Sequence, residues 1–78
     1  MVELNRKASG KRLKLILVKR GIKNKELAEK LGFKDSSTIS RWIAGDAVPS
    51  YEMLVNLAII LRCKVKDLVV FNQHSAGT

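Results

Sequence analysis

The sequence has few of the residues that define disulfide-rich or metal-binding proteins. Its 78 residues include one cysteine, Cys63, and one histidine, His74. A lone cysteine cannot form an internal disulfide, and Cys63 has no second cysteine or adjacent histidine with which to bind a metal. Packing is therefore the expected role of Cys63, and neither a metal nor another cofactor is expected.

Long apolar runs are also missing. Residues 15–18 form an apolar run that is too short for the core of a secretory signal. No run approaches the roughly 20 apolar residues that a membrane helix requires. We therefore expect a cytoplasmic protein with no membrane partner.

Groupings of catalytic residues are not visible in the sequence. His74 stands in a small, polar C-terminal segment, and the acidic residues are spread along the chain. There is no nucleophile and base pair, and no glycine-rich loop of the kind that holds phosphate. An enzyme is not expected.

Acidic residues are scarce relative to basic ones. The chain has 15 Lys and Arg against 7 Asp and Glu, which gives a net charge of +8. Residues 1–30 hold ten basic and three acidic side chains, whereas residues 31–78 hold five and four. This charge predicts a polyanionic partner, although a solvated basic surface without a partner is the alternative. A membrane surface fits less well, because residues 13–18 are too short and mixed for an interfacial helix.

The most informative segment is residues 24–42, which reads as two helices joined by a turn. The first, at about residues 24–31, ends at Gly32, because glycine readily adopts the left-handed conformation that closes a helix. The second, at about residues 36–44, buries Ile39, Trp42 and Ile43, and Asp35 or Ser36 is expected to cap it. Its outward side chains are predicted to be Ser36, Ser37, Ser40 and Arg41. A recognition helix for the DNA major groove has this layout, and a plain helical hairpin is the alternative.

The whole chain predicts an all-α fold of five helices without a convincing strand. The other helices are expected from Ser9 or Gly10 to Arg20, after Ser50 to about Leu61, and over residues 65–71. We expect the chain to consist of a basic N-terminal arm at 1–9, a DNA-binding domain at 10–71 and a flexible tail at 72–78. The buried side of the fourth helix is expected to comprise Tyr51, Leu54, Val55, Leu57, Ala58 and Leu61.

Several separated motifs occur in the order and spacing of a known family. They are Asn24-Lys-Glu-Leu-Ala-Glu-Lys-Leu-Gly-Phe, Ser37-Thr-Ile-Ser-Arg-Trp, Gly45, Pro49-Ser and the largely apolar segment 54–61. Over about residues 10–70 the chain resembles the lambda-repressor and Cro-type (XRE-like) helix-turn-helix family. The resemblance implies a five-helix domain that binds a double-stranded DNA operator, usually as a dimer. The short length resembles small phage or prophage regulators of the lysis and lysogeny type, which act as repressors in the nucleoid of the bacterial host.

The same resemblance implies a role for individual residues. Ser36, Ser37 and Arg41 match positions that read base edges, with Ser40 and Thr38 in support. Arg41 is expected to be the most selective, since arginine can donate two hydrogen bonds to guanine. Contacts to the DNA backbone are expected from Asn24, which matches a phosphate-binding position, and from Lys23, Lys25, Lys34, Thr38 and Arg12. Three departures stand out: the turn is one residue longer than usual, Asn24 replaces the common glutamine, and the apolar Leu17 and Ile43 stand where many relatives pair an arginine with a glutamate.

Some apolar residues are predicted to lie off the core and so to form a partner surface. They are Leu15, Val18, Met53, Ile60, Val70 and Phe71. A homodimer formed through them would present two recognition helices to half-sites one helical turn, about 34 Å, apart. The alternative function is an antirepressor or modulator that binds a partner repressor protein and contacts DNA weakly or only within that complex.

Overall fold

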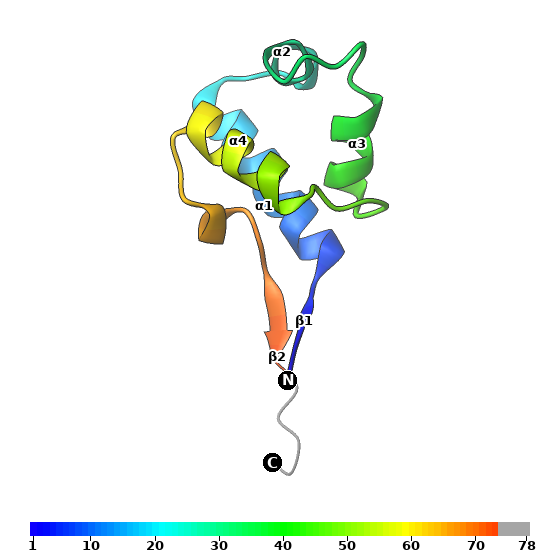
Figure 1. The fold of residues 1–78 in the computed structure, drawn as a ribbon, viewed down its shortest axis with the longest axis vertical. Coiled ribbons are helices and arrows are strands. Elements are labelled where there is room, and N and C mark those ends of the chain that lie inside the picture. Colours follow the sequence, from blue (N-terminus) through cyan, green and yellow to red (C-terminus); the bar gives the residue numbers. More distant parts are fainter. Residues whose placement is uncertain (74–78) are drawn as a thin grey trace.

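The computed structural model describes residues 1–73, and the predictions for residues 74–78 of the tail, which include His74, lie outside the described residues. Four α-helices form a compact head, from which a two-stranded ribbon projects (Figure 1). In chain order the elements are β1 (Val2–Leu4), α1 (Arg6–Arg20), α2 (Asn24–Lys30), α3 (Ser37–Ala44), α4 (Tyr51–Leu61), the 3-10 helix η1 (Val65–Asp67) and β2 (Phe71–Gln73). The predicted helical fold is confirmed, with the fifth helix reduced to this single 3-10 turn.

The first helix begins earlier than the expected start at Ser9 or Gly10. Asn5 caps it, because the Asn5 side-chain oxygen accepts a hydrogen bond of 2.9 Å from the backbone N–H of Ala8. The helix closes as predicted at Gly21, whose φ of 68° is left-handed. Residues 6–9, which were assigned to a basic arm, are thus the first turn of α1.

The expectation that the chain has no strand is wrong. β1 pairs antiparallel with β2, with Val2 opposite Gln73 and Leu4 opposite Phe71. The backbone N–H of Asn5 donates to the Val70 carbonyl at 2.8 Å, and the Val70 N–H donates to the Ser9 hydroxyl at 2.8 Å. These contacts between the two ends of the chain hold residues 72 and 73, which were expected in a flexible tail, within the ribbon.

The core lies where α1, α2, α3, α4 and the segment after η1 meet. Its buried apolar residues are Leu13, Ile16, Leu17, Leu27, Ala28, Ile39, Trp42, Leu57, Ala58, Leu61 and Leu68. Met53 and Ile60 are partly buried against this core, so the expectation that they lie off it is wrong. Tyr51 was expected inside but is 75% exposed, because it occupies the first turn of α4 beyond the edge of the core. Cys63 is partly buried against the core, as predicted.

The two ends of α4 are fixed by polar contacts. The Ser50 hydroxyl accepts from the Met53 N–H at 3.1 Å, which confirms Ser50 as the N-cap. At the other end the Arg20 guanidinium donates to the carbonyls of Leu61 (2.9 Å) and Arg62 (3.0 Å). Because carbonyls in the last turn of a helix have no partner within the helix, Arg20 ties the end of α1 to the end of α4.

None of the helices described in residues 1–73 has the length and apolar content that crossing a membrane requires.

Candidate nucleic-acid interface

The turn between α2 and α3 is closed by backbone bonds and an aromatic contact. Gly32 has a φ of 79°, and the next residue, Phe33, donates its N–H to the Ala28 carbonyl at 2.8 Å. The Phe33 ring then meets the Trp42 ring edge to face, with centroids 5.8 Å apart and planes at 66°. Phe33 thus fixes the turn against the inner side of α3.

The inner side of α3 also rests directly on α1. Ile39 and Trp42 are buried, with exposed fractions of 0% and 6%. Gly10 lies so close to the end of α3 that a Cβ there would clash with the carbonyl oxygens of Trp42 and Ile43. Only glycine allows this approach, which holds α3 against the side of α1 (Figure 1).

The outer side of α3 carries the predicted reading residues. Ser37, Ser40 and Arg41 are exposed, whereas Ser36 and Thr38 are half-buried. The helix begins at Ser37, and Ser36 occupies the N-cap position without a side-chain capping bond. The exposed set therefore combines one long cationic donor with two short hydroxyls on one helix of eight residues.

Asp35 supplies the cap that Ser36 does not. One carboxylate oxygen of Asp35, Oδ1, accepts hydrogen bonds from the Ser37 backbone N–H (2.9 Å) and from the Ser37 hydroxyl (2.6 Å). These bonds, the one from the hydroxyl first, lower the pKa of Asp35 below its ordinary value, because they favour the ionised carboxylate. The Ser37 hydroxyl therefore has its proton directed at Asp35 and its lone pairs available to solvent.

The residues predicted to contact the DNA backbone are only partly brought together. Lys23 and Lys25 are exposed on either side of Asn24, at the start of α2, and Lys34 is exposed in the turn. Asn24 is half-buried, and its Oδ1 has no hydrogen-bond partner among the described residues. Because phosphate oxygens need donors, only the amide nitrogen of Asn24 suits a phosphate contact.

Arg12 lies apart from this group. Its guanidinium donates to the Asp67 carbonyl in η1 at 3.4 Å. Two residues along a helix correspond to a rotation of about 200°, so Arg12 faces away from the side on which Gly10 meets α3. By contrast Lys7, a basic residue of the segment expected to form the N-terminal arm, lies against Gly45 at the end of α3. Lys7 lies there because α1 starts at Arg6. The only sequence feature that could have indicated this early start is Asn5, a residue type that is common at the N-cap of helices.

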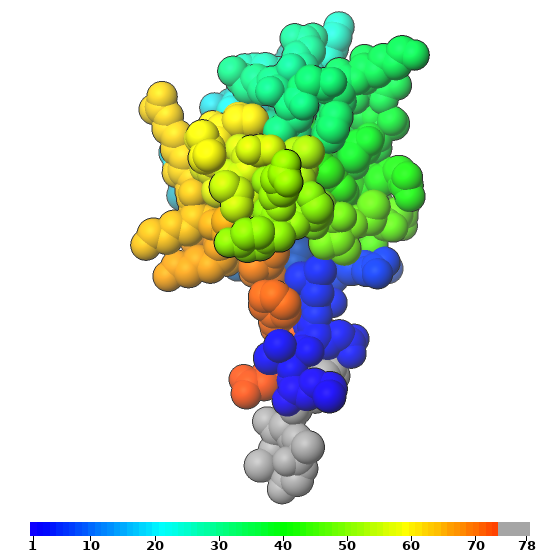
Figure 2. Space-filling view, in the orientation of Figure 1, coloured from blue at the N-terminus to red at the C-terminus, as the bar shows by residue number. Residues whose placement is uncertain are grey.

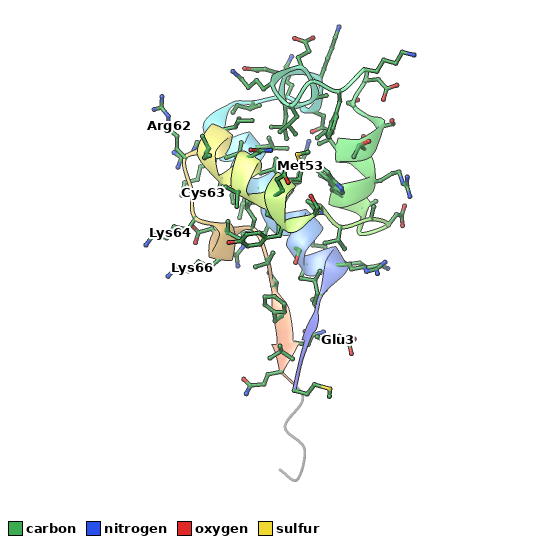
Figure 3. All side chains as sticks on the ribbon, viewed as in Figure 1. Glu3, Met53, Arg62, Cys63, Lys64 and Lys66 are labelled. Carbon is green, nitrogen blue, oxygen red and sulfur yellow. The ribbon has the colours of Figure 1, made fainter. Side chains whose placement is uncertain are left out.

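Other basic side chains surround a different part of the molecule. Figure 3 shows Arg62, Lys64 and Lys66 projecting from the end of α4 and from η1, on the side opposite α3. The net charge of +8 is therefore not confined to the surface that includes α3.

This geometry agrees with the comparison to known protein families. The helix-turn-helix model HTH_3 matches residues 13–68, which include all four helices in whole or in part. The chain belongs to the helix-turn-helix family. The predicted resemblance to lambda-repressor-like proteins is confirmed, and family membership supports a DNA-binding regulator of a class that is typically not enzymatic.

A solved structure supports the same assignment for this helix-turn-helix protein. The crystal structure of a "putative DNA-binding protein from Bacteroides fragilis" has a TM-score of 0.72 and 31% sequence identity. The match covers 90% of this chain and 100% of the other. No curated protein matches the chain significantly.

Proposed function

We propose that this helix-turn-helix protein is a sequence-specific transcriptional regulator that inserts α3 into the major groove of double-stranded DNA. The observation that carries the proposal is the outward face of α3, where Ser37, Ser40 and Arg41 are exposed on a helix fixed by buried Ile39 and Trp42. A rigid helix with short polar side chains and one arginine can approach base edges closely.

Each reading residue has a distinct expected role. Arg41 is free to donate two parallel hydrogen bonds to the O6 and N7 atoms of a guanine. Ser37 directs its proton to Asp35, so its lone pairs accept from an amino group, such as adenine N6 or cytosine N4. Ser40 adds a hydroxyl on the same face, where the half-buried Ser36 would add a further base contact and Thr38 a contact to the DNA backbone.

Phosphate contacts position the helix without reading sequence. Lys23 and Lys25, on either side of Asn24, would hold one strand, and Lys34 would reach the backbone beside the turn. Arg12 was included in this group from the sequence, but its bond to the Asp67 carbonyl favours a structural role in place of a phosphate contact. Lys7, beside the end of α3, takes its place in the proposal.

The biological setting is proposed from the family resemblance. We infer a Cro-like or repressor-like role of the phage lysis and lysogeny type, in the host cytoplasm at the nucleoid, with the protein bound to its operator as a homodimer. The helix-turn-helix family and the basic surface support this setting, since dimers of such domains bind two half-sites one helical turn apart.

A second candidate is favoured by the outer face of α1. Leu15 and Val18 are 62% and 66% exposed and lie three residues apart on this helix. Such a pair offers an apolar contact for another protein. An antirepressor or modulator that binds a partner repressor would use this face and would contact DNA weakly.

The test is selection of bound fragments from random duplexes at near-physiological salt. Arg41→Ala and Arg41→Lys are run beside Arg62→Ala, a control that removes an equal charge on the side away from α3 (Figure 3). We expect a motif whose guanine preference is lost in Arg41→Ala, weakened in Arg41→Lys and kept in the control, because lysine lacks the rigid planar fork of donors that arginine has. An unchanged motif in Arg41→Ala would refute base reading by α3, and binding without any motif would favour the partner-binding role.

A further inference from the structure

A large share of the basic residues lies away from α3. Figure 2 shows the segment that follows α4, coloured yellow to orange, standing out from the head on the side opposite the green α3. Three cations of this segment, Arg62, Lys64 and Lys66, are exposed and project on that side (Figure 3). The proposed reading of DNA by α3 uses none of these three residues.

The outer face of α1 adds further cations to the same side. Arg12, Lys19 and Arg20 line an open hollow in the surface together with Cys63 and Asp67 of the segment after α4. Arg12 and Lys19 are seven residues apart, so they lie on one face of α1, about 10 Å apart along its axis. The hollow is thus a seam between α1 and the segment after α4, with basic side chains on both of its sides.

The charge of this region is strongly one-sided. The residues that line the hollow or belong to segment 62–67 include six cations and one carboxylate, that of Asp67. The rest of the chain holds nine basic residues and six acidic ones. We call the six cations the rear basic surface. They are Arg12, Lys19, Arg20, Arg62, Lys64 and Lys66.

Two of the six cations hold the seam together. Arg20 donates to the carbonyls at the end of α4, and Arg12 donates to the Asp67 carbonyl in η1. The Asp67 carboxylate accepts from the Lys64 backbone N–H at 2.9 Å. The other four cations donate no side-chain hydrogen bond, and pair with no carboxylate, within the described part of the chain. Their charges are therefore available to an anion from outside.

The composition of the rear basic surface suits phosphate better than it suits protein. Lysine is depleted in protein–protein interfaces, in which aromatic side chains are enriched. Half of these six cations are lysines, and none of the residues that line the hollow is aromatic. Lysine and arginine bind phosphate groups without needing apolar contacts. Like charges on one surface also repel one another, so a bound polyanion would relieve this repulsion.

The absence of aromatic side chains from the hollow also favours a duplex over a single strand. Single-stranded nucleic acids are held largely by stacking of their bases on aromatic rings. A duplex presents its phosphates outward, and cations alone are enough to bind it. A protein that is held on DNA through α3 also meets duplex phosphates at a high local concentration.

We propose that the rear basic surface binds the phosphate backbone of a second DNA duplex, so that the protein joins two DNA segments. This inference rests on the proposed function, because α3 must occupy the first duplex. The four free cations contact phosphates of the second duplex and read no sequence there. The product is a bridge between an operator and DNA of any sequence. Loss of a rear cation leaves the motif that α3 reads unchanged.

The bridge is tested with the full chain and two duplexes. An immobilised duplex carries the motif that the protein selects, and protein is added only until the half-sites are filled. A labelled duplex without the motif then follows at micromolar concentrations, because sequence-independent binding has dissociation constants of about 10⁻⁴–10⁻⁶ M. Since α3 is already occupied in each bound copy, retention of the labelled duplex reports on another surface.

Two variants each remove three exposed lysines, so that their net charges are equal. The rear variant combines Lys19→Gln, Lys64→Gln and Lys66→Gln. The front control combines Lys23→Gln, Lys25→Gln and Lys34→Gln.

The two variants should have opposite effects. We expect the rear variant to weaken binding of the labelled duplex about tenfold or more, and to keep half-site affinity within about threefold. The front control should weaken half-site binding, but once the half-sites are filled it should retain the labelled duplex as the original chain does. Retention by the original chain should also fall between about 50 and 200 mM salt, because phosphate binding releases counterions.

Equal retention of the labelled duplex by the rear variant and the original chain would overturn the proposal. Retention of polyglutamate or of anionic lipid vesicles, without retention of the duplex, would also overturn it, since the partner would then be an acidic protein or a membrane. If the original chain failed to bind the immobilised duplex, the proposed function would be refuted. The rear basic surface would still be judged by whether the rear variant binds the labelled duplex more weakly than the front control.

Discussion

Replacing Gly10 with alanine tests the contact that sets the position of α3 against α1. A Cβ at Gly10 would lie 2.5 Å from the carbonyl oxygen of Trp42 and closer still to that of Ile43, whereas ordinary contacts begin at 3.4 Å. Both oxygens belong to the backbone at the end of α3, so no change of rotamer relieves the clash. The two helices would have to separate by about 1 Å, as in an overpacked core.

Two opposing terms give the size of the effect. Overpacking costs about 1–3 kcal/mol, while alanine is favoured over glycine within a helix by about 1 kcal/mol. Because the clash is with backbone on both sides, we expect overpacking to exceed the helix term. The net loss of stability should be about 1–2 kcal/mol, which lowers the melting temperature of a domain of this size by roughly 5–15 °C.

Thermal unfolding followed by circular dichroism measures this change. Lys14→Ala is a matched control, since Lys14 is exposed on the same helix and its replacement should alter stability by no more than about 0.5 kcal/mol. A melting temperature for Gly10→Ala equal to or above that of the original chain would refute the close packing of α1 on α3.

Two further predictions concern the ends of helices. Asp35→Ala should destabilise the chain by about 1 kcal/mol in urea unfolding, because it removes the cap of α3, whereas Asp35→Asn keeps an acceptor for Ser37 and should cost less. Because the pKa of Asp35 is lowered in the folded state, the ionised carboxylate adds to the free energy of unfolding above the ordinary carboxyl pKa. This stabilisation is lost as the pH falls through the lowered pKa. If Asp35→Asn left the pH dependence of stability in that range unchanged, the result would contradict this account. Arg62→Gly should stabilise the chain by about 0.5–1 kcal/mol, because Arg62 has a left-handed φ of 56°, which glycine adopts at less cost. Thermal unfolding measures this change. A lower melting temperature would show that the Arg62 side chain contributes more to stability than the backbone conformation costs.

The helix-turn-helix could be predicted from the sequence because its signals are local. Gly32 and Gly45 end helices through left-handed backbone conformations, and Ser50 begins one through a hydrogen bond three residues away. The buried stripe of Ile39 and Trp42 follows from helical periodicity alone. Each of these features involves residues within a few positions of one another, so the sequence by itself determined these helix ends, the buried side of α3 and the family.

The ribbon was decided by contacts between residues more than sixty positions apart. Val70 bonds to Asn5 and Ser9, and neither partner can be identified from a pattern that extends over a few residues. Short strands of three residues also give too little alternation to distinguish them from a loop.

Which side chains are exposed was also decided in part by the sequence and in part by the tertiary structure. The sequence determined that α4 is apolar, but not that Met53 and Ile60 would be partly buried while Tyr51 and Ile59 are exposed. An almost wholly apolar helix has no clear face of its own, so the neighbouring helices select which residues are covered. Likewise Arg12 and Arg20 were indistinguishable as charges, and only the tertiary structure placed backbone carbonyls within their reach.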